Sequence, residues 1–193
     1  MPSSVTDPGD AFEAGVRVAR TLERHGISYA LGGALAYGQY GIPRATNDVD
    51  VNVFLAADAI DGVFAALRTL GIEIDTVAAK RQVESEGMFI TRFADFRLDV
   101  FLPSIDFSWE AERTRVRRTI EGVGVWFLSV EALCVFKLLF FRGKDVVDLE
   151  RLIAVQGSAI DHSYVRTQIV AMAGEEDERV ATWDRLWADH LPR

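Results

Sequence analysis

The residues best suited to chemistry lie between Asp48 and Phe54, where the chain reads Asp-Val-Asp-Val-Asn-Val-Phe. Polar and apolar residues alternate here, which is typical of a half-buried strand, so Asp48 and Asp50 would share one face. Two carboxylates about 7 Å apart along a strand repel each other unless a cation lies between them. Oxygen ligands of this kind suit Mg²⁺. Taken alone, the pair is better explained as two solvent-exposed acids.

Gly32 and Gly33, sixteen residues before Asp48, favour a functional site over two solvent-exposed acids. They follow an expected strand and open an expected helix, where glycines let the backbone approach a phosphate and the helix N-terminus attracts anions. A pair of glycines usually marks only a tight turn, and its place upstream of the acids makes it informative. Arg44 and Thr46 lie in the connecting loop. Arg44 is equally well explained as a triphosphate contact or as a surface arginine.

Asp99 is a third candidate acid, in the apolar segment Phe96–Phe101. An unpaired charge in a largely buried strand is costly, so this carboxylate needs a metal ion or a cationic partner. Beside the first pair it could ligate one ion and act as general base on an attacking hydroxyl. The alternative is a salt bridge with Arg97 or Arg92.

The elements that must position these residues follow from periodicity and from glycine and proline stops. Helices are expected over 11–25, 34–40, 59–70, 130–141, 146–156, 162–172 and 178–190, and strands over 28–31, 48–55, 89–93, 96–102, 115–120 and 123–128. This order predicts an α/β (α+β) fold. A mixed-sheet catalytic core would occupy residues 1–128, and a C-terminal helical bundle would occupy residues 129–193.

Composition narrows the class of protein. The 193 residues are 49% hydrophobic and 26% charged, an ordinary globular composition, and the net charge of −8 argues against broad electrostatic capture of nucleic acid. The single Cys134 lies in an apolar run and is expected to be a buried thiol. The polar residues 1–10 show no signal pattern, and no apolar run is long enough to cross a membrane, which favours a cytoplasmic protein.

One local basic cluster comprises Arg113, Arg115, Arg117 and Arg118. On a strand, the first three would project from one face and could follow a phosphate backbone. The same residues would also suit a solvated edge strand or an antitoxin-binding surface.

Gly-Gly, then Arg-x-Thr-x-Asp-x-Asp, then a later Asp resembles the nucleotidyltransferase superfamily that includes DNA polymerase β, over residues 29–102. The stretch from Lys137 to Leu149 resembles the AbiEii/AbiGii toxin family, whose members carry a helix lysine followed by a basic Asp-x-x-Asp segment. That resemblance implies that Lys137 contacts nucleotide phosphates and that Asp145 or Asp148 supports the site. From the residues alone, Lys137 either snorkels or meets an anion, and a purely structural role is well supported for the two acids.

The resemblance implies an enzyme that moves a nucleoside monophosphate from an NTP to a hydroxyl, with two Mg²⁺ ions. Asp48, Asp50 and Asp99 would be the metal ligands, and Lys137 would assist. A toxin-like enzyme acting on RNA such as tRNA, with a cognate antitoxin, is the leading interpretation. The alternatives are an antibiotic nucleotidyltransferase of the aminoglycoside or lincosamide type and a non-catalytic nucleotide-binding relative. The acidic net charge suits a cationic antibiotic.

Overall fold

The computed structural model describes residues 7–190, so residues 1–6 of the segment examined for a signal pattern lie outside it. The contacts divide the chain into two compact units. We call residues 7–35 and 45–128 the sheet unit, and residues 36–44 and 129–190 the helical unit. Residues 36–44 come from the first half of the sequence but pack with the helices of the second half.

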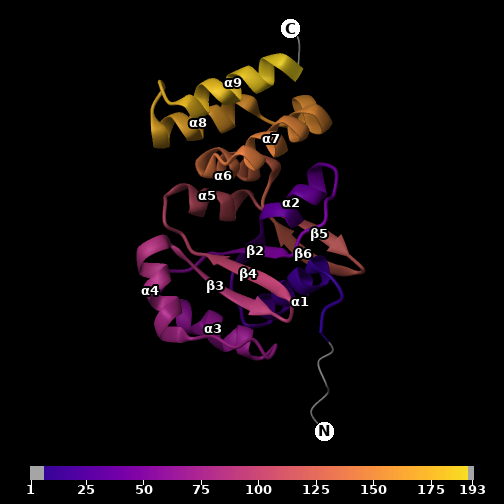
Figure 1. Cartoon of the computed structure of the whole chain (residues 1–193), viewed down its shortest axis with the longest axis vertical. Coiled ribbons are helices and arrows are strands. Elements are labelled where there is room, and N and C mark those ends of the chain that lie inside the picture. The colour runs from indigo at the N-terminus through magenta and orange to yellow at the C-terminus, as the bar shows by residue number, and fades with distance from the viewer. Residues whose placement is uncertain (1–6, 191–193) are drawn as a thin grey trace. The chain divides into compact units, whose positions relative to one another are not determined.

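The sheet unit is organised around six strands. They are β1 (Tyr29–Leu31), β2 (Asp48–Val53), β3 (Met88–Phe93), β4 (Phe96–Phe101), β5 (Val116–Ile120) and β6 (Val123–Phe127), in the order β3-β4-β2-β1-β6-β5. The β2–β4 and β1–β6 pairs are parallel, and the other neighbours are antiparallel. The predicted mixed sheet is therefore confirmed, and Figure 1 shows β2, β4 and β3 side by side.

Alternation along β2 places its side chains on two different surfaces. Val49, Val51 and Val53 are buried, whereas the intervening polar residues are half-buried. Helix α1 (Ala11–Arg24), capped by Asp10, contacts β1, β2 and β6. Its Gly15 lies against Val49, so α1 covers the valine face of β2 and the polar face points the other way.

Two helices of this unit were not expected from the sequence. They are α4 (Thr76–Glu86), which contacts β3, and α5 (Phe107–Thr114). Only two residues of α4 are buried, Ala79 and Val83, so the segment lacks the apolar stripe that predicts a helix. Asp75 caps α4 at its start by accepting hydrogen bonds from two backbone N–H groups. The remaining helices of the unit are α3 (Ile60–Arg68), the 3₁₀ turn η1 (Ala57–Ala59) and the start of α2 (Gly33–Tyr40).

The helical unit packs α6 (Val130–Phe140), α7 (Gly143–Gln156), α8 (His162–Ala173) and α9 (Glu178–His190) around a core that contains the fully buried Trp183. A 3₁₀ turn, η2 (Gly157–Ala159), follows α7, and the second half of α2 belongs here. Each predicted C-terminal helix is thus present. Within residues 7–190, none of the helices is long and apolar enough to span a membrane.

Cys134 on α6 is fully buried, and burial raises the pKa of its thiol well above the ordinary value. Because it is the only cysteine, thiol labelling reports directly on opening of the helical unit. We expect no reaction with Ellman's reagent in buffer and one equivalent in denaturing urea. Rapid labelling of the folded protein would contradict the buried position.

Candidate active site

Three carboxylates lie on one face of the sheet, on the neighbouring strands β2 and β4. Asp48 and Asp50 are two residues apart on β2, and the parallel register pairs Asp50 with Asp99 of β4. Paired residues on neighbouring strands point to the same face, so the register brings Asp99 beside the first two acids. The predicted strand and the predicted neighbourhood of the three acids are both present.

Gly33 lies directly against Asp50. Its backbone φ is +48°, a left-handed conformation that residues with a Cβ rarely adopt. A Cβ built on Gly33 would lie 1.8 Å from Asp50 Oδ2, so the carboxylate occupies the space that any other residue would need. Gly32 is also confined, because its Cβ would lie 2.8 Å from Asn52 Nδ2. The glycine pair thus brings the start of α2 against the carboxylate row.

Arg97 provides the cation nearest to this row. Its Nε donates a 2.7 Å hydrogen bond to Asp99 Oδ1, and the register places Arg97 opposite Asp48. The hydrogen bond to Asp99, and then the charges of Asp99, Asp48 and Asp50, raise the pKa of the guanidinium above its ordinary value. The salt bridge with Arg97, which was the alternative role considered for Asp99, is therefore present. The positive charge of Arg97 also reduces the electrostatic repulsion among the three acids.

The carboxylates have the chemistry of Mg²⁺ ligands but are not grouped as a finished metal centre. Within residues 7–190, no three His, Cys, Asp or Glu side chains are placed so as to hold an ion. Asp48 and Asp50 supply hard oxygen donors on one strand face, which fits a divalent cation. Asp99 would have to exchange Arg97 for the metal.

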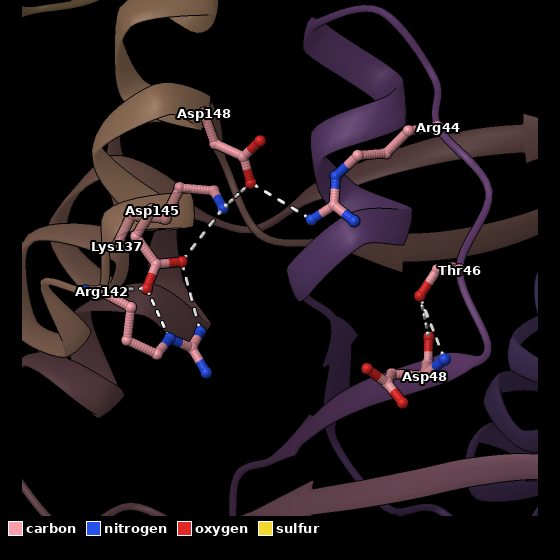
Figure 2. Close-up of polar contacts among 7 residues, drawn as sticks. All are labelled: Arg44, Thr46, Asp48, Lys137, Arg142, Asp145 and Asp148. Carbon is pink, nitrogen blue, oxygen red and sulfur yellow. Dashed lines mark hydrogen bonds and ion pairs between the residues drawn. The ribbon is translucent and has the colours of Figure 1, made fainter.

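A second cluster of charges lies within the helical unit, at the start of α7. Lys137 Nζ donates a 2.6 Å hydrogen bond to Asp148 Oδ2, and Arg44 Nη2 lies 3.3 Å from the same oxygen (Figure 2). Lys137 and Asp148 are buried, whereas the Arg44 side chain is 39% exposed. The Lys137 ammonium also lies 5.6 Å from the centre of the Tyr37 ring. The lysine thus meets anions supplied by the protein itself.

Asp145 completes this cluster. Its carboxylate accepts hydrogen bonds from the backbone N and the guanidinium of Arg142, and Lys137 Nζ lies 3.6 Å from its Oδ1 (Figure 2). Burial alone would raise the pKa of Asp145, but the hydrogen bonds from Arg142 and the charges of Lys137 and Arg142 lower it below its ordinary value. Two buried acids are therefore matched by three cations, and the sequence reasoning missed Arg142.

The structure separates the predicted site residues into these two groups. Gly32, Gly33, Asp48, Asp50 and Asp99 are gathered in the sheet unit; Arg44, Lys137, Asp145 and Asp148 are gathered in the helical unit. Thr46 belongs to the sheet unit, where its hydroxyl accepts a 3.0 Å hydrogen bond from Asp48 N and so fixes the start of β2 (Figure 2). Their catalytic and ligand roles stay predictions.

The predicted arginine face on a single strand is wrong. Arg113 belongs to α5 and pairs with Glu110, and Arg115 turns inward to Ser28 and stacks over Trp126. The segment becomes a strand only at Val116, because α5 extends to Thr114. Glu112 also pairs with Arg115, and the acids at 110 and 112 were the signal that these arginines had local partners.

Solved structures resemble most of the chain. The solution structure of the antibiotic-resistance factor ANT(2'')-Ia matches with a TM-score of 0.56 and 16% identity, over 91% of this chain and 95% of that one. The crystal structure of ANT(2'')-Ia in complex with adenylyl-2''-tobramycin matches with a TM-score of 0.58 and 14% identity, over 90% and 97%. The chain therefore has the predicted nucleotidyltransferase fold.

No protein-family model and no curated protein matches the sequence. The resemblance to the AbiEii/AbiGii family is thus not shown by any comparison and stays a prediction. At these identities the solved structures establish the fold, and the activity must be argued from the residues.

Replacing Gly33 with alanine tests its contact with Asp50. We expect Gly33→Ala to destabilise the protein by at least about 1–2 kcal/mol, because the left-handed backbone disfavours a Cβ and the carboxylate occupies its place. Gly62→Ala on α3 is the matched control, since its Cβ meets open space and alanine should stabilise the helix by roughly 0.5–1 kcal/mol. Urea unfolding compares them, and equal stabilities would contradict the contact.

Replacing Lys137 tests whether this lysine is primarily a structural counter-ion. Lys137→Met removes one partner of a buried ion pair, which costs about 3–5 kcal/mol when the other charge is left behind. Lys80→Met is the control, because the Lys80–Asp61 pair is exposed and should contribute little. If Lys137→Met unfolds at the wild-type urea concentration while the KM for NTP rises, the lysine contacts nucleotide instead.

Proposed function

We propose that the protein is an Mg²⁺-dependent nucleotidyltransferase. The observation that carries this proposal is the register of β2 and β4, which sets Asp99 beside Asp50, with Gly33 held against the Asp50 carboxylate. A carboxylate row next to a glycine-opened helix start suits a triphosphate and its cations. The nucleotidyltransferase fold supports this reading of the site.

The reaction would transfer a nucleoside monophosphate. The acceptor hydroxyl oxygen bonds to the α-phosphorus of the NTP, the bond from that phosphorus to the bridging oxygen breaks, and pyrophosphate leaves. Bound Mg²⁺ would neutralise charge on the phosphates and stabilise the attacking and leaving oxygens. Asp48 and Asp50 would hold the metal, and Asp99 would complete the ligand set and accept the proton of the attacking hydroxyl.

Other residues would serve binding. The backbone of Gly32 and Gly33 would lie near the triphosphate. Arg44 and Thr46 stay predicted nucleotide-binding residues, and Arg44 is the most exposed cation of its cluster after Arg142. Lys137, Asp145 and Asp148 would act chiefly by holding Arg44 and Arg142 in place, because the lysine is buried between the two acids.

RNA is our leading acceptor, in a cytoplasmic toxin-like enzyme of a toxin–antitoxin system. This rests on the resemblance of residues 137–149 to the AbiEii/AbiGii toxins, and it implies a cognate antitoxin as partner. The second candidate is an antibiotic nucleotidyltransferase. ANT(2'')-Ia, crystallised with adenylyl-2''-tobramycin, matches the chain over 90% of its length, and a net charge of −8 attracts cationic aminoglycosides.

Labelled nucleotides test the activity. The purified protein is incubated with Mg²⁺ and each of the NTPs labelled at the α-phosphate, first with total tRNA and then with aminoglycosides. We expect label on one acceptor class. Asp50→Asn should lower the rate more than about 100-fold, since loss of even an outer partner of a metal ligand costs about 10- to 100-fold. Asp58→Asn, at an exposed acid in η1, is the control.

Two outcomes would count against the proposal. Label on no acceptor would contradict the proposal that the protein is an enzyme. Equal transfer rates for Asp50→Asn and Asp58→Asn would contradict the proposal that Asp50 belongs to the active site. Growth arrest on expression that is lost in Asp50→Asn would favour the toxin over the resistance enzyme.

A further inference from the structure

Two arginines face each other on the polar side of the sheet, next to the carboxylate row. The antiparallel register of β3 and β4 pairs Arg92 directly with Arg97, and both residues are exposed. Like charges directly opposite on neighbouring strands destabilise a sheet. Negative charge close by compensates a pair of this kind.

The protein compensates the pair only in part. Among residues 7–190, the Arg97 side chain donates a hydrogen bond only through Nε, to Asp99, and its terminal nitrogens have no acceptor. Arg92 donates through Nη2 to the backbone oxygen of Asp95 at 2.6 Å, and this carbonyl carries no charge. Only Asp99 pairs directly with either guanidinium, while Asp48 and Asp50 act on Arg97 through their charges alone. The N–H groups that remain without an acceptor suit the oxygens of a phosphate.

The position of this pair relates it to the proposed reaction. Asp99, the proposed general base, is two residues from Arg97 on the same face of β4, about 7 Å along the strand. The residue opposite Asp99 on β3 is Ile90, which is apolar and 40% exposed. A molecule that presents a hydroxyl to Asp99 and extends along the strands would reach the two arginines.

We propose that Arg92 and Arg97 bind a phosphate of the acceptor, so that the acceptor is the end of a nucleic-acid chain. This inference rests on the proposed function, because it takes Asp99 as the residue that meets the acceptor hydroxyl. A terminal nucleotide carries a hydroxyl and a phosphodiester one sugar apart, so a single ligand could meet both Asp99 and the two arginines.

Arg118 offers a competing surface for the same ligand. It is exposed on β5, the edge strand at the opposite end of the sheet from β3, and its side chain makes no hydrogen bond or ion pair with the residues that the structure describes. Nucleic acid bound there would be held by charge alone, far from Asp99 in strand order. The test must therefore separate the two positions.

The experiment measures binding of a short fluorescein-labelled single-stranded RNA by anisotropy, with Mg²⁺ constant and without NTP. A DNA of the same sequence and a labelled aminoglycoside are run in parallel. We compare wild type with Arg92→Gln, Arg92→Lys and Arg118→Gln over a series of salt concentrations. Arg20→Gln, at an exposed helical arginine, is the control. Arg92 was chosen because its side chain pairs, within the described residues, only with a backbone oxygen, so its loss leaves no carboxylate there unpaired.

We expect Arg92→Gln to weaken RNA binding and to lower the slope of log K against log salt by about 0.7, the value for one phosphate contact on a single strand. Arg92→Lys should restore most of the slope, since a lysine keeps the charge. Arg20→Gln and Arg118→Gln should match wild type. If DNA binds as tightly as RNA, the protein contacts the phosphate alone. If DNA binds more weakly, the protein also contacts the ribose.

Several results would overturn the inference. The inference is wrong if the wild-type protein does not bind RNA or if Arg92→Gln leaves the slope of log K against log salt unchanged. It is also wrong if Arg118→Gln, and not Arg92→Gln, weakens RNA binding. Because no NTP is present, the measurement does not depend on catalysis. Label transfer to an aminoglycoside together with an unchanged salt slope in Arg92→Gln would support the transferase activity and contradict the phosphate site. A lowered salt slope in Arg92→Gln without label transfer to any acceptor would support the phosphate site and contradict the transferase activity.

Discussion

Repulsion among three carboxylates on one face of the sheet is the constraint that the other features of the sheet unit accommodate. The parallel register of β2 and β4 forces Asp50 and Asp99 together, and alternation adds Asp48 to the same face. Arg97 compensates one of these charges. In our proposal, the negative charge of the row would attract a cation, and that cation would in turn bind a triphosphate. Gly33 matters because its missing side chain leaves room for Asp50 at the helix start.

In the helical unit, by contrast, the buried acidic side chains are paired with cations of the protein itself. Asp145 and Asp148 are buried, and each is paired with Lys137 and with an arginine from the loop or helix end. A buried cluster matched in this way has little charge left for a ligand, and removing one member leaves another uncompensated. We therefore propose a catalytic role for the carboxylate row and a supporting role for the closed cluster. The partly exposed arginines at its rim remain the part suited to contact an anion.

The sequence was sufficient where a single periodicity decides the structure. Alternation from Asp48 to Val53 identified β2 and its polar face, and the apolar stretch around Asp99 correctly indicated a partner for that acid. The sequence was insufficient where an element has no clear periodicity, and where pairing depends on distant segments. Helix α4 lacks an apolar stripe, and its start depends on the Asp75 cap. Neither the opposition of Arg92 and Arg97 nor the shared contact of Arg44 and Lys137 with Asp148 follows from spacing.

The central claim is that the carboxylate row binds metal and nucleotide together. The most direct measurement is a crystal structure of the protein with Mg²⁺ and a non-hydrolysable NTP. Our account predicts metal on the carboxylates of Asp48 and Asp50, with the triphosphate against the backbone of Gly32 and Gly33. It further predicts that Arg97 has left Asp99. Metal and nucleotide bound away from β2, or an Arg97–Asp99 pair unchanged beside a filled metal site, would contradict it.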